Sequence, residues 1–291
     1  MTEELDFYAS VGPMTDLGRF DEQLAEAPTD PVEVAAFVRN LLLHPFWAEA
    51  YGVTVPEASR NDVQIRGAAA MLDRILEIDP RPLADSRELD HRFFGNCRHF
   101  STLTVALLRR AGVPSRARCG FAGYFEPGKW VDHWIVEHWD GTRWVRLDPQ
   151  IDDFQRRATG LDADPADLPP GQFLAGGEAW LACQSGDEDP EQFGILDMWG
   201  AWFIRGNLVR DIASLNKVEM LPWDVWGVLA VEPPPPGSDA YVGQIAELTA
   251  SGEFDALRSR YRSDDGLQVP SQVMAMFTLN GPTAVDVFEL S

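Results

Sequence analysis

Apolar residues in the first third of the chain recur at the spacing of amphipathic helices. The first such stretch starts at Asp30 and Pro31, a capping side chain followed by a residue that suits a first helical turn. Pro45 is expected to end that helix at about His44, because proline cannot continue it. The pattern predicts helices over about 31–44, 62–77 and 97–111, after an irregular segment over 1–29.

After residue 114 the period changes to two, and aromatic and β-branched residues become frequent. This pattern predicts strands over 115–125, 131–139 and 142–148. Asp140-Gly141 is a hairpin-turn signal between the last two strands. With a two-residue loop, Trp139 pairs with Thr142. A four-residue loop would move every pairing by two positions and keep each side chain on the same face.

The composition changes beyond Pro149. Residues 151–191 carry ten acidic residues against two arginines, which predicts a long surface excursion with a short helix over 178–184. Glu232 and the prolines at 233–236 predict a stiff, extended spacer. We expect further helices over 193–217, 239–250 and 254–262, followed by an ill-defined apolar tail.

Helices, then strands, then helices again indicate an α+β fold. We divide it into an N-terminal helical segment over 1–60, a core over 61–150, and an acidic loop with an α-helical extension over 151–291, packed on the core. The extension holds four tryptophans close together: Trp199, Trp202, Trp223 and Trp226. Because monomers rarely expose large apolar patches, we expect this aromatic block to pack near the site and narrow it.

Charge and composition limit the class of protein. The 291-residue chain carries 24 basic and 46 acidic residues, a formal net charge of −22. Such a field repels phosphate backbones and anionic membranes, so neither nucleic acid nor a membrane is expected as a partner. No apolar run approaches the ~20 residues that span a bilayer, and the N-terminus lacks an apolar signal core. Three cysteines cannot all pair, which favours a reducing compartment, and we expect a cytoplasmic protein.

Candidate chemistry gathers at Cys97, which begins the third predicted helix. A helix N-terminus stabilises a thiolate, although a lone cysteine is more often a small core residue, as we expect for Cys119 and, in helix packing, Cys183. The predicted hairpin places His133 and Asp148 on one face, opposite each other with a two-residue loop and diagonal with a four-residue loop. An ion pair on a solvated face would give the same pattern. The order cysteine, histidine, aspartate favours a nucleophile, its base and an orienting group.

Three separated blocks of sequence resemble the transglutaminase-like superfamily. They are GNCRHF and ALLRRAGVPSR within residues 95–116, HWIVE at 133–137, and WVRLDP at 144–149. The resemblance covers about residues 60–150, and it implies a papain-like core in which the nucleophile helix packs on a small antiparallel sheet. It also implies Cys97 as nucleophile, His133 as general base and acid, and Asp148 as the orienter. The remaining chain shows neither the sandwich domains nor the calcium loops of animal cross-linking transglutaminases.

The activity implied by this resemblance is acyl transfer or amide hydrolysis through a Cys97 thioester, without a metal or organic cofactor. The substrate would be a peptide or small-molecule amide or thioester, and the acceptor would be water or an amine. An amide synthase of a small-metabolite pathway and a non-catalytic peptide-binding scaffold remain as alternatives, and the oligomeric state stays open. Weaker candidates for substrate binding are His91, as an oxyanion-hole side chain, Asn96 and Trp134.

Overall fold

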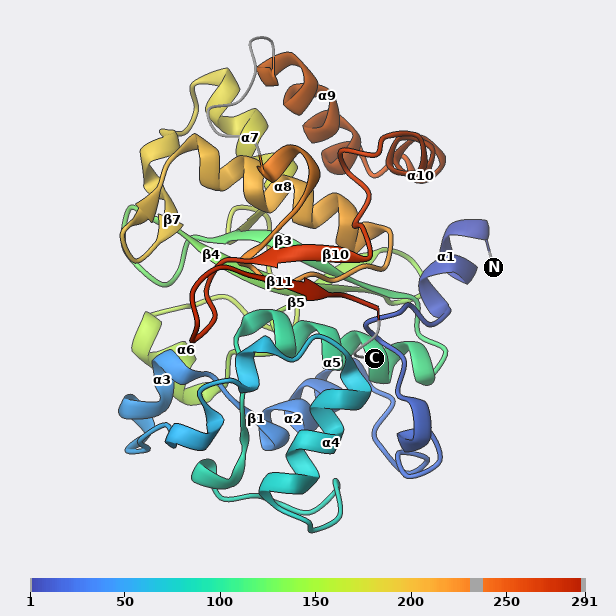
Figure 1. Cartoon of the computed structure of the whole chain (residues 1–291), viewed down its shortest axis with the longest axis vertical. Coiled ribbons are helices and arrows are strands. Elements are labelled where there is room, and N and C mark those ends of the chain that lie inside the picture. Colours follow the sequence, from blue (N-terminus) through green and yellow to red (C-terminus); the bar gives the residue numbers. More distant parts are fainter. Residues whose placement is uncertain (1, 231–237, 289–291) are drawn as a thin grey trace.

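Helices cover both faces of a six-stranded mixed sheet (Figure 1). The computed structural model describes residues 2–230 and 238–288, and it confirms the expected α+β class. The helices are α1 (Glu3–Ala9), α2 (Pro31–Leu41), α3 (Pro45–Ala48), α4 (Ala68–Ile78), α5 (Cys97–Arg110), α6 (Asp153–Thr159), α7 (Gly176–Ser185), α8 (Ala201–Leu215), α9 (Ser238–Ser251) and α10 (Phe254–Ser263). The strands are β1 (Leu42–Leu43), β2 (Phe93–Phe94), β3 (Ser115–Ala122), β4 (Trp130–Trp139), β5 (Trp144–Leu147), β6 (Phe173–Ala175), β7 (Phe193–Ile195), β8 (Met198–Trp199), β9 (Asp224–Val225), β10 (Gln272–Ala275) and β11 (Thr283–Asp286).

The central sheet runs in the order β6-β3-β4-β7-β8, and β5 pairs with β4 beside this path. β3 and β4 form a long antiparallel pair in which Gly120 lies opposite His133. β4 also pairs in parallel with β7, where Trp130 lies opposite Phe193. The extension therefore joins the sheet of the predicted core at two places, through β6 on β3 and through β7 on β4.

Helix α5 lies below the sheet in Figure 1 and packs on β3 and β4. All residues from 97 to 109 are buried, which is more than the apolar stripe of the helix explains. The additional burial arises because the extension returns to this helix. The Arg98 guanidinium donates to the Glu219 carbonyl oxygen at 2.9 Å, and Arg109 donates to the Glu219 carboxylate at 3.3 Å. The extension therefore braces the helix that begins with Cys97.

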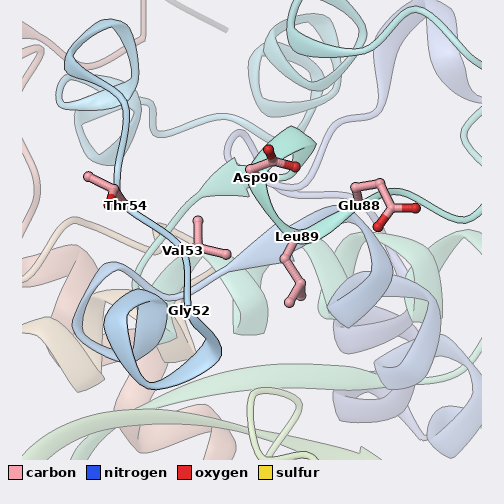
Figure 2. A pocket seen from close by; sticks show the side chains of 6 residues that line it. All are labelled: Gly52, Val53, Thr54, Glu88, Leu89 and Asp90. Atoms are coloured by element: carbon pink, nitrogen blue, oxygen red, sulfur yellow. The ribbon is translucent and has the colours of Figure 1, made fainter.

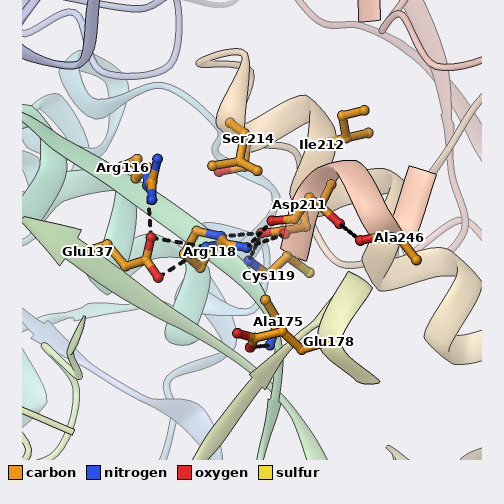
Figure 3. Close-up of polar contacts among 12 residues, drawn as sticks. Arg116, Arg118, Cys119, Glu137, Ala175, Glu178, Asp211, Ile212, Ser214 and Ala246 are labelled. Atoms are coloured by element: carbon orange, nitrogen blue, oxygen red, sulfur yellow. Dashed lines mark hydrogen bonds and ion pairs between the residues drawn. The ribbon is translucent and has the colours of Figure 1, made fainter. Parts of the chain in front are cut away.

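Helix α8 lies on the opposite face of the sheet, above β3 in Figure 1. Asp211 of α8 accepts two hydrogen bonds from Arg118, at 2.8 and 2.9 Å, and Arg118 also pairs with Glu137 at 3.0 Å (Figure 3). Nearby, Asn207 donates to the Asp132 carboxylate at 2.8 Å. These buried contacts fix α8 beside the residue that precedes His133.

Several predicted boundaries in the N-terminal half are wrong. The helix expected to reach His44 ends at Leu41, and Pro45 begins α3 instead of stopping α2. This follows from the ambiguity of proline, which also suits the first position of a helix. The helix expected from residue 62 begins at Ala68, and the segment over 1–29 contains α1, capped by the Thr2 hydroxyl.

The extension also differs from its prediction. The segment at 193–199, expected to be helical, forms β7 and β8 around a tight turn in which Leu196 has φ 57°, and the helix α8 follows only from Ala201. The acidic excursion over 151–191 contains α6 and β6 as well as the predicted α7, and the tail forms the hairpin β10–β11. Helices α9 and α10 confirm the expectation, whereas the spacer expected at 232–236 lies outside the described residues.

The aromatic block is only partly buried. Trp226 is 3% exposed and packs in the core of the extension, whereas Trp202 is 50% exposed. Trp199 and Trp223 are half-buried. Among the helices within the described residues, none is long and apolar enough to cross a membrane.

Candidate active site

Cys97 is the first residue of α5, and the start of this helix is fixed by a reciprocal cap. The Asn96 side chain accepts the N–H of Arg98 at 3.1 Å, and Nδ1 of His99 accepts the N–H of Asn96 at 3.1 Å. Capping side chains of this kind stabilise a helix by about 1 kcal/mol. Cys97 is only 6% exposed, so the surrounding protein covers most of it.

His99 holds the first turn of α5 from inside. Its Nε2 lies 2.9 Å from the Ile65 carbonyl oxygen, and because a carbonyl oxygen can only accept, Nε2 carries the proton and donates it. Burial, together with the neighbouring Arg98 charge, lowers the pKa of His99 well below its usual value. The ring therefore stays neutral and serves to position the turn that carries Cys97.

The structure brings His133 and Asp148 together at one end of β4. Nε2 of His133 lies 2.8 Å from Oδ2 of Asp148, and both side chains are buried. The predicted two-residue hairpin loop is wrong, because Trp139 pairs with Trp144 and not with Thr142. The observed register is that of the four-residue loop, in which Asp148 lies diagonal to His133. The change of two positions preserves the face, which is why the contact survives the error.

Asp148 is held by further hydrogen bonds that complete its shell. Gln150 donates its backbone N–H to Oδ1 at 2.9 Å, and the Tyr124 hydroxyl donates to Oδ2. The Phe125 ring packs edge-on against His133 at a centroid distance of 4.9 Å. Sequence reasoning missed Tyr124 and Phe125, because aromatic residues at the end of a predicted strand give no signal that separates them from core.

Cys97 completes the series. The His133 imidazole and the backbone N–H of Trp134 both lower the pKa of its thiol, against the larger effect of burial. Because Nε2 of His133 faces Asp148, the nitrogen that faces the sulfur is Nδ1. The three residues singled out from the sequence thus lie together in the order sulfur, imidazole and carboxylate, and a 2.8 Å contact joins the last two.

Burial and charge compete at all three groups. Burial raises the pKa of the Cys97 thiol, and the neighbouring His133 offsets this only in part. Burial alone would lower the pKa of His133, but the Asp148 carboxylate outweighs it and raises the pKa to about 10. Burial would also raise the pKa of Asp148, yet the His133 charge keeps it below its usual value. At neutral pH the site therefore favours the imidazolium, the form that stabilises a neighbouring thiolate.

The weaker candidates occupy different positions. Asn96 is engaged as the helix cap, and Trp134 is fully buried with its indole N–H unpartnered within the described chain. The His91 side chain is 53% exposed, and its Nδ1 faces Asp79 at 3.8 Å. Nothing in the described chain brings His91 to Cys97 or His133, so the structure does not gather it into the site.

A surface cavity of about 430 Å³ lies near the strands that precede Cys97 (Figure 2). Its lining residues are Gly52, Val53, Thr54, Glu88, Leu89 and Asp90. Leu89 and Val53 also pack in the cluster formed by Leu43 and Phe94, so the cavity adjoins β1 and β2, and none of its lining residues is Cys97, His133 or Asp148. Among the described residues, no group of three or more histidine, cysteine or acidic side chains is arranged to hold a metal ion.

Comparisons with known proteins agree with this geometry in part. Residues 68–149 match the family model of the transglutaminase-like superfamily, and this segment contains Cys97, His133 and Asp148. The comparison with curated proteins returned no significant match.

Two solved structures are similar over part of the chain. One is a candidate cysteine protease from Cytophaga hutchinsonii, at 17% identity and a TM-score of 0.32, covering 52% of this chain and 43% of that one. The other is red sea bream transglutaminase, at 20% identity and a TM-score of 0.28, covering 42% of this chain and 22% of that one. The similarity thus spans less than half the length of either relative.

Proposed function

We propose that the segment matching the transglutaminase-like superfamily, residues 68–149, catalyses acyl transfer or amide hydrolysis through a Cys97 thioester. The observation that carries the proposal is the series Cys97–His133–Asp148, with a 2.8 Å contact between imidazole and carboxylate. A cysteine nucleophile needs an adjacent base, and the base needs an orienting group. In this proposal Cys97 is the nucleophile, His133 the general base and acid, and Asp148 the orienter.

The first half-reaction forms the thioester. In the reacting form the thiol proton resides on Nδ1 of His133, and the Cys97 thiolate attacks the carbonyl carbon of an amide or thioester. A sulfur–carbon bond forms, and the carbonyl π electrons move to oxygen. When this intermediate collapses, His133 gives its proton to the leaving amine or thiolate, and the acyl group stays on sulfur.

The second half-reaction releases the acyl group. The neutral His133 now takes a proton from water or from an amine as that molecule attacks the thioester carbonyl. The sulfur–carbon bond breaks, and the imidazolium and thiolate are restored. Asp148 holds the ring orientation and stabilises its positive charge throughout, as the third member of such triads does.

The substrate and setting are part of the proposal. We take the acyl donor to be a peptide or a small-molecule amide or thioester, with water or an amine as acceptor, because the series acts on a carbonyl and needs no cofactor. The 6% exposure of Cys97 favours a slender acyl group. We further propose that the chain divides into the segments 1–60, 61–150 and 151–291. A cytoplasmic setting is also part of the proposal, because it suits the three free cysteines.

Intact-mass measurement of the full chain with 4-nitrophenyl acetate tests the chemistry. The wild type should gain one acetyl group, peptide mapping should place it on Cys97, and Cys97→Ser should show no rapid acetylation. Cys119→Ser and Cys183→Ser are matched controls that should acetylate like the wild type. Acetylation that persists in Cys97→Ser, or no acetylation of the folded wild type, would overturn the proposal in favour of a non-catalytic scaffold.

The same acyl-enzyme separates the acceptors. Its decay in buffer measures transfer to water, and its decay with added methylamine measures transfer to an amine. Faster decay with methylamine, with N-methylacetamide as product, indicates an amine-accepting transferase or amide synthase. Equal decay with and without methylamine indicates a hydrolase.

A further inference from the structure

His44 stands beside the start of α5 although it precedes Cys97 by more than fifty residues. β1 pairs in parallel with β2, with Leu43 opposite Phe94, and Gly95 donates its N–H to the Leu43 carbonyl oxygen at 3.2 Å. His44 and Gly95 directly follow the last residues of β1 and β2, so both lie at the same end of this parallel pair. His44 therefore begins α3 alongside the turn at Gly95 and Asn96 that begins α5.

The hydrogen bonds of His44 determine its tautomer. Nδ1 accepts the backbone N–H of Phe46 at 3.2 Å, so the proton of the neutral ring lies on Nε2. The Phe46 ring packs edge-on against the imidazole at a centroid distance of 5.4 Å and limits its rotation. Within residues 2–230 and 238–288, Nε2 has no hydrogen-bond partner. The ring thus presents one fixed N–H donor that the fold does not use.

The environment keeps this donor neutral. Burial lowers the pKa of His44 to about 3, and the neighbouring His133 charge adds to the effect, whereas Asp148 opposes it. The influence of both triad residues is consistent with a ring that lies close to them. A neutral imidazole can donate a hydrogen bond without competing for the proton that His133 moves.

Thioester chemistry needs such a donor. Attack by Cys97 places negative charge on the former carbonyl oxygen, and preorganised N–H groups stabilise it. The backbone N–H of Cys97 is one such group, because it precedes the first hydrogen-bonded turn and the Asn96 cap accepts from Arg98 instead. The oxyanion can accept a second hydrogen bond beside the one from this backbone N–H. A side chain on the other side of the site can donate it.

We propose that His44 is a catalytic residue that donates its Nε2–H to the oxyanion formed on attack by Cys97. This assignment rests on the proposed thioester chemistry. It replaces the sequence-based choice of His91, whose side chain is exposed and faces Asp79. The oxyanion site consists of the Cys97 backbone N–H and the His44 imidazole, and the Phe46 backbone fixes the direction of the latter.

Paired rates on the full-length protein test the assignment, because the two probes differ in whether an oxyanion forms. Acylation of Cys97 by 4-nitrophenyl acetate passes through an oxyanion, whereas alkylation by iodoacetamide displaces iodide at a saturated carbon and does not. His44→Phe keeps an aromatic ring and removes the N–H. It should lower the acylation rate by about 10²–10³-fold and leave the alkylation rate at the wild-type value. His44→Gln restores an N–H donor and should recover part of the acylation rate.

The possible outcomes separate the two levels of the proposal. Wild-type acylation in His44→Phe, or an equal fall of acylation and alkylation, would overturn the role of His44. Loss of acylation in His91→Phe with His44→Phe unaffected would move the role to His91. If the folded wild type alkylates at Cys97 but never acylates there, the proposed function fails first, and the oxyanion assignment fails with it.

Discussion

Strand β4 contributes one residue to each of two buried charge clusters. Glu137 belongs to the first cluster, and His133, four residues earlier, belongs to the second. The Glu137 carboxylate accepts from Arg116 at 2.8 Å and from Arg118 at 3.0 Å (Figure 3). It also accepts from Arg146 at 3.2 Å. Both Glu137 oxygens are thus fully occupied by arginine N–H groups. His133 is equally buried, yet its cluster ends at Cys97, a residue that is 6% exposed.

The difference lies in what each cluster leaves unused. Around Glu137, burial would raise the pKa of the carboxyl, but Arg118 and its neighbours lower it well below the usual value, so it remains charged. Arg118 extends this cluster to Asp211 of α8, which ties the extension to the sheet. The His133 cluster ends instead at a thiol that can exchange its proton with the ring. The first cluster therefore holds the fold, and the second is arranged for the proposed chemistry.

The largest effect is expected at His133, in the cluster that is arranged for the proposed chemistry. His133→Ala removes the proton acceptor of Cys97, so acylation by 4-nitrophenyl acetate should slow by about 10³–10⁴-fold. Stopped-flow absorbance of the released nitrophenolate measures the rate. His138→Ala, on the same strand, is the matched control and should acylate at the wild-type rate. A fall of the same size in His138→Ala would show that any buried histidine of β4 matters, and the contrast would be lost.

The next effect concerns the other cluster. Glu137→Gln leaves three arginines without their shared charge, and breaking a buried pair in this way costs about 3–5 kcal/mol of unfolding free energy. Glu4→Gln removes an acidic partner of Arg116 at the surface and should cost less than about 1 kcal/mol. Urea unfolding measures both. Acylation per folded molecule should stay at the wild-type level, and a specific loss of acylation in Glu137→Gln would break the proposed separation of the two clusters.

A smaller effect appears in the pH dependence of stability. Burial would lower the pKa of His133, but Asp148 raises it from 6.5 to about 10, so this group stabilises the native state below pH 6.5. That contribution is lost as the pH rises through the folded-state value. The difference in unfolding free energy between wild type and Asp148→Asn should therefore shrink between about pH 6.5 and about pH 10. A constant difference over this range in urea unfolding would contradict a charged His133–Asp148 pair.

The proximity of Cys97, His133 and Asp148 could be predicted from sequence because their placement depends on features that tolerate error. Cys97 follows a capping asparagine, and His133 and Asp148 stay on one face whether the hairpin loop has two or four residues. The resemblance to the transglutaminase-like superfamily adds the order of the three blocks, and the matching segment at 68–149 agrees with it.

Other parts could not be predicted because their signals are ambiguous or distant. Pro45 reads equally as the end of one helix or the start of another, which concealed the position of His44. Alternating charges such as Arg118 and Glu137 resemble a solvated strand face, and the return of α8, which places Asp211 on Arg118, lies too far along the chain to be read from the strand pattern. The sequence of the β7–β8 turn predicts a helix because its aromatic residues also suit a helix.

The most direct test of the account is the order in which iodoacetamide labels the three cysteines of the native protein at neutral pH. Cys183 is more exposed than Cys97, yet its pKa is raised to about 11 by burial and nearby acidic residues. Cys119 is fully buried, and burial raises its pKa well above the usual value. If His133 activates Cys97, peptide mass spectrometry should show Cys97 labelled on the order of tenfold faster than Cys183, with Cys119 last. Faster labelling of Cys183, with Cys97 unmodified in the folded chain, would mean that burial governs the thiol and would contradict its role as nucleophile.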